Sequence, residues 1–352
     1  MSGICCRLKA RSVYLRKPLD LDTLVLVLNK MGHSGVVSAW YELEQLSGGT
    51  VGEVWLLSGS AALAGGTKIA FQLVLKVQQK WERHGDPDSW RREYDLYVSG
   101  LDALFPGKLR WPECYHAAMN EADDEIQLWL EYINGVSGAD LPPPAYELAA
   151  YELGRFQGTL YASRPTVLNT LVNLSPVDYA ERFYKHYRSW DRVYDYIRSE
   201  GCAIPKHLCV MLIALDDSSE AVFERIRKLP LVLCHRDFWV ENILLQNDTI
   251  YLIDWDTAGW GYLGEDVASL LADEADVEHL ADNYRRCVPA YYRGFMEFAG
   301  ISAIEHDCIK DFMFLMYGYR LVEWFLDAED QAAKDLQLKT LQGIFDIAQS
   351  MN

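Results

Sequence analysis

The residues of this chain best placed to do chemistry are a histidine, two aspartates and an asparagine. His235, Asp237 and Asn242 lie within ten residues of one another, and a short apolar run later ends at Asp254. A carboxylate can accept the proton of an attacking hydroxyl group. An amide oxygen and a second carboxylate suit Mg²⁺, which prefers oxygen ligands. The grouping therefore predicts phosphoryl transfer to a hydroxyl, with Mg²⁺ held at Asn242 and Asp254.

The segment between Asn242 and Asp254 is expected to fold as a hairpin, because two short apolar runs flank Asn247-Asp248. Asn and Asp tolerate the backbone conformations that a tight turn requires. If residue 246 opposes residue 249 or 250, then Asn242 opposes residue 253 or 254. Directly opposed residues of antiparallel strands lie about 5 Å apart. The pattern thus brings the amide and the second carboxylate together at the open end of the hairpin.

Asp237 is expected on the loop that enters this hairpin, five residues before Asn242, where it can take the proton of a hydroxyl. His235 is expected to brace the backbone of the same loop. Any one of these residues alone would be interpreted as an ordinary loop or strand-end residue. The combined spacing, His-x-Asp-x4-Asn and then a hairpin that ends in Asp, is much harder to obtain by accident.

This segment resembles the catalytic loop and metal-binding aspartate of the aminoglycoside phosphotransferase and choline kinase-like superfamily, whose members are related to protein kinases. The resemblance assigns the catalytic base to Asp237, with His235 beside it, and Mg²⁺ to Asn242 and Asp254. It implies an α+β, bilobal, protein kinase-like fold, with ATP and Mg²⁺ as cofactors. Asp254-Trp255-Asp256 stands where a protein kinase has Asp-Phe-Gly, which favours the small-molecule branch.

A kinase of this kind also needs a glycine-rich turn, a strand lysine, a helical glutamate and a hinge, in that order. Gly48, Gly49 and Thr50 lie in a glycine-rich run whose backbone N–H groups could approach phosphate, and a plain hairpin turn accounts for the run about as well. Lys76 lies at the end of a strand-like run. The resemblance places it against the α- and β-phosphates, whereas an unrelated strand would carry it as a surface lysine.

Glu93 lies in the helix predicted after Pro87 and is the expected partner of Lys76, because a buried ammonium group requires a counter-charge. A solvent-exposed helical carboxylate is the alternative. Residues 125–135 resemble the last strand of the small lobe as it enters the hinge. The resemblance assigns contacts with adenine there to the carbonyl of Glu131 and the amide of Ile133.

The chain is expected to divide into four segments. Residues 1–35 form an N-terminal lead and helix, and residues 36–131 form the nucleotide-binding N-lobe, a small antiparallel β-sheet with one key helix. Residues 132–144 are a hinge and linker. Residues 145–352 form a larger, mostly helical C-lobe with the catalytic loop and substrate site. Within it, the resemblance implies that Asp266 caps a helix and binds the backbone of the catalytic loop.

The composition excludes several classes of protein. Half of the 352 residues are hydrophobic and 24% are charged, which predicts a globular chain large enough for two cores. The net charge of −18 disfavours nucleic acid and anionic membranes as partners. No apolar run approaches the roughly 20 residues of a transmembrane helix, and the first residues lack a secretory leader pattern. The eight scattered cysteines favour free thiols in a cytoplasmic protein. The oligomeric state cannot be inferred.

The phosphate acceptor is expected to bind in the helical lobe, near Asp256 and a later helix. On that helix Tyr319, Glu323 and Trp324 occupy neighbouring positions. Aromatic and acidic groups together can hold an amine through cation–π contact and hydrogen bonds, and the acidic chain also favours cationic ligands. The alternative is that Trp324 is a core residue and Glu323 pairs with Arg320.

These patterns predict an ATP- and Mg²⁺-dependent kinase that transfers a γ-phosphoryl group to a hydroxyl of a small molecule. An amine-bearing acceptor is favoured, and aminoglycosides, choline-like compounds, sugars and amino alcohols all remain candidates. The alternative is a catalytically silent, nucleotide-binding scaffold. Retention of Lys76, Asp237, Asn242 and Asp254 argues against it. A protein kinase is disfavoured because the chain lacks Asp-Phe-Gly and Ala-Pro-Glu motifs.

Overall fold

The computed structural model describes residues 19–46, 52–81, 86–187, 190–273, 276–304 and 308–350. The chain divides into two compact units. The first comprises Met1–Gly100 and Trp111–Asn134, and the second comprises Leu101–Arg110 and Gly135–Asn352. The sequence placed Leu101–Arg110 in the N-lobe, whereas the structure packs this segment within the larger, helical unit.

The first unit is built on a five-stranded antiparallel sheet in the order β1-β2-β3-β6-β5. Its strands are β1 (Val36–Gln45), β2 (Gly52–Leu63), β3 (Lys68–Gln79), β5 (Cys114–Asn120) and β6 (Glu125–Glu131). Two helices accompany them, α1 (Leu21–Lys30) and α2 (Ser89–Val98). The side chain of Asp20 begins α1 by accepting hydrogen bonds from the backbone N–H groups of Asp22 and Thr23.

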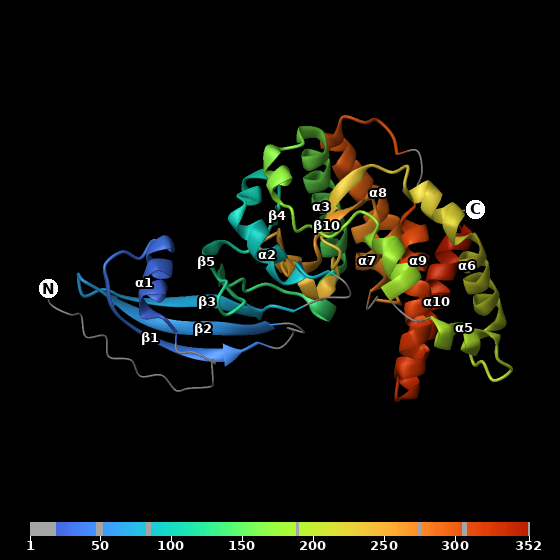
Figure 1. Ribbon diagram of the computed structural model, residues 1–352, viewed down its shortest axis with the longest axis horizontal. Coiled ribbons are helices and arrows are strands. Elements are labelled where there is room, and N and C mark those ends of the chain that lie inside the picture. The colour runs from blue at the N-terminus through green and yellow to red at the C-terminus, as the bar shows by residue number, and fades with distance from the viewer. Residues whose placement is uncertain are drawn as a thin grey trace. The chain divides into compact units, whose positions relative to one another are not determined.

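The two faces of β3 have different roles because side chains alternate along a strand. Phe71, Leu73 and Leu75 are buried in a core that also contains Leu24 and Leu28 of α1. Figure 1 shows α1 lying across the sheet. Alternation places Lys76 on the opposite face of β3, away from this core.

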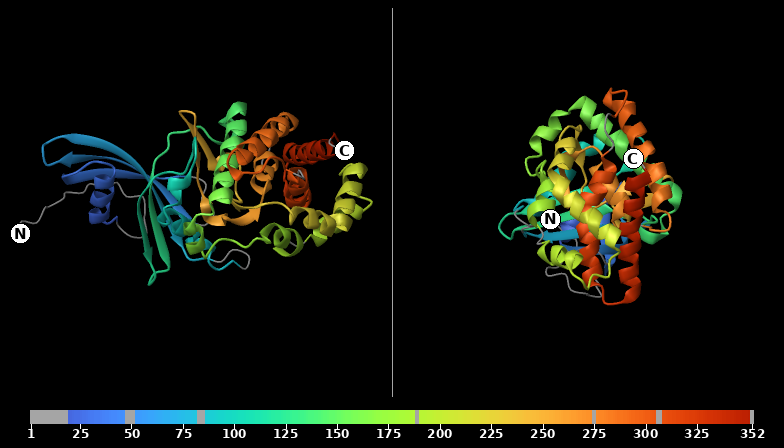
Figure 2. Two further views of the ribbon diagram at one scale, coloured as in Figure 1. Left: turned by 90° about the horizontal axis from the view of Figure 1, so that it is seen from above. Right: turned by 90° about the vertical axis from the view of Figure 1, so that its right-hand side faces the viewer.

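The second unit is mostly helical. Its helices are α3 (Pro143–Ser163), α4 (Tyr179–Arg182), α5 (Asp191–Arg198), α6 (Lys206–Ile226), α7 (Glu265–Ala272), α8 (Leu280–Ala299), α9 (Ile309–Asp327) and α10 (Gln331–Ser350). Figures 1 and 2 show α3 and α8 side by side. The crossing is close because a side chain at Gly154 would collide with the carbonyl of Tyr291, and one at Gly294 with the carbonyl of Tyr151.

Short strands carry the catalytic segment of the second unit. β7 (Leu231–Cys234) pairs with β10 (Gly259–Tyr262), and β9 (Thr249–Leu252) lies between β8 (Ile243–Gln246) and β4 (Leu109–Arg110). The predicted hairpin is present, because Gln246 opposes Thr249 and the backbone N–H of Ile253 donates to the carbonyl of Asn242. The sheet-rich first unit and helical second unit confirm the predicted α+β class. None of the helices in the described ranges combines the length and apolar character needed to cross a lipid bilayer.

Candidate active site

Asp237 and Asn242 are joined by hydrogen bonds at the entrance to the hairpin. The side-chain nitrogen of Asn242 donates to the Asp237 carboxylate at 2.7 Å and to the Asp237 carbonyl oxygen at 2.9 Å. Asn242 ends a short turn, Val240–Asn242, directly before β8 and is buried. Because its nitrogen is committed to Asp237, the oxygen of the amide points away from that residue and can serve as a ligand.

His235 braces the loop. It is fully buried, and its Nδ1 accepts a hydrogen bond from the backbone N–H of Asp237 at 3.2 Å. The Nε2 atom therefore carries the proton and donates to the carbonyl of Ile253 at 2.9 Å. One imidazole thus ties the loop that carries Asp237 to the strand end before Asp254. This geometry agrees with the expected bracing role of His235.

The carboxylate of Asp266 holds the backbone of the same loop. It accepts hydrogen bonds from the backbone N–H groups of His235 at 2.9 Å and Arg236 at 2.7 Å, and from the side chain of Gln157 at 3.0 Å. Gln157 also donates to the carbonyl of Leu233. Burial raises the pKa of Asp266 to about 7. The expected contact between Asp266 and the loop backbone is present. Asp266 does not cap the helix, however, because Gly264 is the N-cap of α7 and Asp266 lies in its first turn. No sequence pattern had indicated Gln157.

Arg236 is a further anchor of the loop, and the sequence reading missed it. Its guanidinium is almost fully buried and pairs with Glu265 at 2.9 Å. It also donates to the Ser175 hydroxyl and to the carbonyls of Pro176 and Trp260. The residue adopts a φ of +67°, which is unfavourable for a side chain of this size. The many bonds of the guanidinium hold the strained conformation in place.

Asp254 follows the hairpin in a left-handed conformation, with φ +64° and ψ +64°. Aspartate tolerates this region better than most residues. The amide oxygen of Asn242 and the carboxylate of Asp254 are hard oxygen donors, and Mg²⁺ typically uses only one or two protein groups beside phosphate and water. Among the described residues no group of three or more His, Cys, Asp or Glu side chains is arranged to hold a metal ion. Asn242 and Asp254 together supply the one or two protein ligands that Mg²⁺ typically uses.

Negative charge accumulates around Asp237. Burial, and after it the carboxylates of Asp254, Asp256 and Asp273, raise the pKa of its carboxyl group to about 7. The hydrogen bond from Asn242 acts in the opposite direction. Several carboxylates in one buried region repel one another, so the region favours a cation.

In the first unit, Lys76 and Glu93 form the expected ion pair. The Lys76 Nζ lies 2.5 Å from the Glu93 carboxylate. The Glu93 side chain is buried, with 2% of its surface exposed, and the Lys76 side chain is largely covered, with 11% exposed. The pair joins β3 to α2. Glu131 is the last residue of β6 and donates its backbone N–H to the carbonyl of Glu113, and Ile133 is buried just beyond it. Gly48, Gly49 and Thr50 lie outside the described residues.

The residues expected to bind the acceptor differ in burial and in their contacts. Asp256 is buried close enough to Asp237 to affect its pKa. Tyr319 is fully buried among Tyr184, Trp190 and Tyr194, and its hydroxyl donates to the carbonyl of Leu212. Its predicted role in binding the acceptor is therefore wrong, because both its ring and its hydroxyl are used inside the core.

Trp324 and Glu323 are only partly buried. The Trp324 ring stacks against the Arg320 guanidinium, with 4.4 Å between the guanidinium carbon and the ring centre. Arg320 pairs with Asp273, at 3.5 Å between Nη1 and Oδ2. The alternative pairing of Arg320 with Glu323 had been considered from the sequence, whereas Asp273 had not been singled out.

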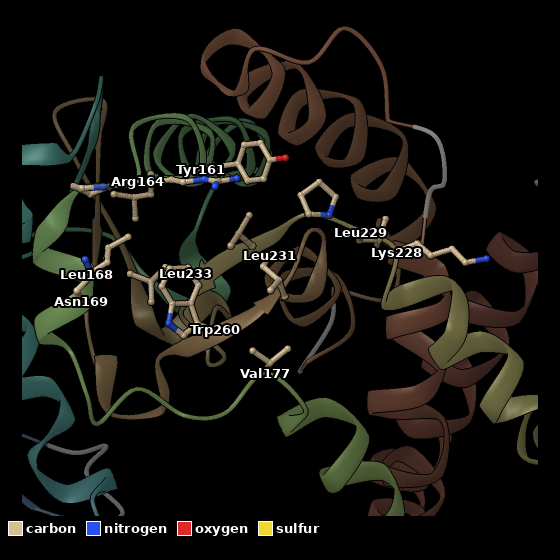
Figure 3. Close-up of a pocket in the computed structure, with 14 residues that line it drawn as sticks. Tyr161, Arg164, Leu168, Asn169, Val177, Lys228, Leu229, Leu231, Leu233 and Trp260 are labelled. Carbon is tan, nitrogen blue, oxygen red and sulfur yellow. The ribbon is translucent and has the colours of Figure 1, made fainter.

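A cavity of about 720 Å³ lies elsewhere in the second unit, against β7 and β10. Its lining is largely apolar, and Figure 3 shows Leu231, Leu233 and Trp260 among the residues that line it. None of the candidate catalytic, metal-binding or acceptor residues lines it. The catalytic loop follows β7 directly, so this cavity adjoins the strand that leads into the loop.

Comparison with known proteins agrees with this geometry. The sequence model described as the phosphotransferase enzyme family matches residues 82–296, more than half of the chain. A search of curated proteins found no match. This match confirms the predicted relationship to the phosphotransferase family.

Three solved structures are similar over most of their length. The microcompartment-associated aminopropanol kinase has a TM-score of 0.57 at 16% identity, over 94% of this chain and 97% of that one. The GDP and kanamycin complex of APH(2")-IIia has a TM-score of 0.53 at 15% identity, over 93% and 99%. The choline kinase from Cryptosporidium parvum Iowa II has a TM-score of 0.50 at 13% identity, over 88% and 90%. These similarities confirm the kinase-like fold.

Proposed function

Because this chain belongs to the phosphotransferase enzyme family, we propose that it transfers the γ-phosphoryl group of ATP to a hydroxyl group of a small molecule, with Mg²⁺ as cofactor. The observation that supports this most is the bonded pair of Asp237 and Asn242 at the end of a hairpin that leads into Asp254. That arrangement sets a base beside two oxygen donors for a divalent ion.

Asp237 orients the acceptor hydroxyl and takes its proton. A general base works best when its pKa lies near the working pH, and the pKa of Asp237 is raised to about 7. Three residues hold the base in place. Asn242 donates to its carboxylate, His235 accepts from its backbone N–H, and Asp266 accepts from the backbone of the preceding residues. Such fixed placement contributes much of the acceleration in phosphoryl transfer, because the reaction needs little covalent help.

Asn242 and Asp254 are the residues that would hold Mg²⁺. The bound ion supplies charge neutralisation on the phosphate oxygens. Asn242 has a double role in this proposal, because its nitrogen holds the base while its oxygen would be a ligand of the metal. Asp254 is set in place by the hairpin, whose register is fixed by the turn at Asn247-Asp248.

Nucleotide binding is assigned to the first unit. Lys76, held by Glu93, contacts the α- and β-phosphates, and Gly48, Gly49 and Thr50 cover the phosphates. The backbone of Glu131 and Ile133 binds adenine. The buried Lys76–Glu93 pair supports this assignment, because an isolated structural role rarely justifies the cost of burying two charges. A related fold has been solved with GDP, which supports nucleotide use.

The acceptor is an alcohol that also bears an amine. The carboxylates around Asp237 and the net charge of −18 support a cationic group. Proteins of the same fold are named for aminopropanol and choline.

The cysteines of the described part are free thiols, which supports a cytoplasmic location.

The test is nucleotide consumption by the purified protein with Mg²⁺, ATP or GTP, and a panel of amino alcohols, sugars and aminoglycosides. We expect ADP release that depends on one class of acceptor and stops when EDTA removes Mg²⁺. Thermal stabilisation by ATP and Mg²⁺ without acceptor-dependent ADP release would indicate the silent scaffold instead. The variant Asp237→Asn serves as the catalytic control.

A further inference from the structure

The cavity against β7 and β10 combines an apolar wall with basic side chains. Leu231, Leu233 and Trp260 belong to the wall, and the charged residues of the lining are Arg164 and Lys228. None of the described residues that line it is an aspartate or a glutamate, although the chain has 51 acidic residues against 33 basic ones. The volume of about 720 Å³ lies within the range of about 300–1,000 Å³ that is usual for small-molecule pockets.

Arg164 brings a guanidinium group that is open to a ligand. Its side chain is exposed and forms no ion pair or hydrogen bond with any residue in the described ranges. Arg164 is also the C-cap of α3 and adopts φ +42° and ψ +57°, a left-handed conformation that costs less with glycine. An arginine carries five N–H donors in a planar fork that matches a carboxylate, so this group retains its capacity for such a partner.

The apolar wall is only partly covered by the protein itself. Leu231 is 44% exposed, and Val177 and Trp260 are half-buried. Figure 3 shows these side chains around the cavity. Removing apolar surface from water is favourable, so a ligand with an apolar body would gain free energy by covering them. The basic side chains and the apolar wall together favour a ligand that is apolar along its length and negatively charged at one end.

We propose that this cavity is a second ligand site and that its ligand is a small amphipathic carboxylate of the fatty-acid type. The carboxylate pairs with the guanidinium of Arg164, and the apolar chain lies along β7 and β10. Lys228 adds to the positive potential that attracts the anion. This inference does not depend on the proposed kinase function, because none of the residues assigned to catalysis, metal or acceptor lines the cavity.

The strands of the wall also anchor the catalytic loop. The carbonyl of Leu233 accepts a hydrogen bond from Gln157, which donates to Asp266 as well. The carbonyl of Trp260 accepts from the guanidinium of Arg236. A ligand in the cavity therefore contacts the two strands whose carbonyls hold the supports of the loop. We expect its binding to suppress local opening of residues 231–236, which is measurable as slower amide hydrogen exchange.

The experiment is a calorimetric titration of the full-length protein with decanoate, decanol and decylammonium, each below the concentration at which it forms micelles. The three compounds share one chain and differ in charge. We expect one decanoate per chain, bound about 10-fold or more tightly than the other two, as for a hydrogen bond between charged groups. Octanoate should bind about 15-fold more weakly than decanoate, because each buried CH₂ group strengthens binding by about fourfold.

Two variants locate the site. Arg164→Asn removes the charge at a position whose left-handed backbone asparagine tolerates, so the affinity for decanoate should fall to that for decanol. Leu231→Glu places a carboxylate against the ligand and should reverse the preference towards decylammonium. Leu336→Glu on α10 is the matched control, because this leucine is also 44% exposed and does not line the cavity. It should bind decanoate as the wild type does. Thermal unfolding checks that each variant is folded.

Several results would overturn the site. They are absent binding of decanoate, equal affinity for decanoate and decanol, and an affinity for decanoate that Arg164→Asn leaves unchanged. An equal loss of binding in Leu231→Glu and Leu336→Glu would indicate dispersed attachment to apolar surface, which also contradicts the proposal. Protection from hydrogen exchange that excludes residues 231–236 would place the ligand elsewhere. Since no nucleotide is present in these measurements, their outcome leaves the proposed phosphoryl transfer untouched.

Discussion

The side-chain amide of Asn242 holds both the side chain and the backbone of Asp237. It donates to the carboxylate at 2.7 Å and to the backbone carbonyl at 2.9 Å. The side chain of Asp237 therefore cannot rotate without losing a hydrogen bond to a buried partner. Because the same asparagine supplies the amide oxygen proposed for Mg²⁺, the positions of base and metal are linked through a single side chain.

Replacing Asp237 by Asn should lower kcat by about 10²- to 10⁴-fold, which is the usual contribution of a positioned base. The amide keeps the size of the carboxylate but cannot accept the proton. Affinity for ATP should change little, because the nucleotide is assigned to other residues. Steady-state kinetics and equilibrium binding of ATP measure the two effects, and an equal loss of both would point to misfolding.

Asp254→Asn should raise the Mg²⁺ concentration needed for half-maximal activity by about 10-fold or more, because the change removes the charge of a ligand. Asparagine also tolerates the left-handed backbone at this position, so strain does not confuse the result. Asp248→Asn is the matched control. It makes the same substitution at a left-handed, exposed residue at the tip of the same hairpin. A Mg²⁺ titration that is identical in the two variants would remove Asp254 from the metal site.

Lys76→Met should raise KM for ATP and also destabilise the protein, because it leaves the Glu93 carboxylate buried without its counter-charge. Breaking a buried pair in this way costs about 3–5 kcal/mol. The double variant Lys76→Met with Glu93→Leu should recover much of the lost stability without recovering nucleotide use. Urea unfolding and ATP kinetics separate the two effects.

The control for that cycle is Lys80→Met. Lys80 follows β3 directly and pairs with Asp124, and about half of each side chain is exposed. Loss of an exposed pair should change the free energy of unfolding by less than about 1 kcal/mol. If the double variant is no more stable than Lys76→Met, the buried pair is not what Lys76 contributes to folding.

Asp266 should make stability depend on pH. Burial raises its pKa in the folded state to about 7 from the ordinary value of 3.8, so the folded protein holds this proton more tightly than the unfolded chain. Its contribution to stability is complete below about pH 4 and is lost as the pH rises to about 7. The free energy by which the wild type exceeds Asp266→Asn should therefore shrink over that interval. Urea unfolding at several pH values measures it, and a constant difference would contradict the shift.

The sequence predicted the catalytic hairpin well because local chemistry specifies it. Asn247 and Asp248 both adopt positive φ, of +49° and +59°, and this turn sets the register that brings Asn242 opposite Ile253. The pairing of Lys76 with Glu93 was also foreseeable, since a lysine on a strand with few polar neighbours needs an opposite charge. In both cases the decisive information lies within a few residues or in one charge requirement.

The acceptor end of the site was less accessible to sequence reasoning. Helix α9 is buried on nearly all sides, so periodicity could not tell which face meets the core, and Tyr319 was assigned to the wrong one. The roles of Arg236 and Asp273 depend on contacts with Ser175, Pro176 and Arg320, which are distant in the sequence.

The length of α7 has a consequence for evolution of the site. Its eight residues rise about 12 Å along the axis, with Asp266 near one end and Asp273 just past the other. Because this short helix is fully buried, it sets the distance between the loop that carries Asp237 and the residue Asp273. Adding or removing one residue would shift the far end by about 1.5 Å and turn it by about 100°. Relatives with an insertion there would hold the residue after α7 in a different place while the loop that carries Asp237 stayed unchanged.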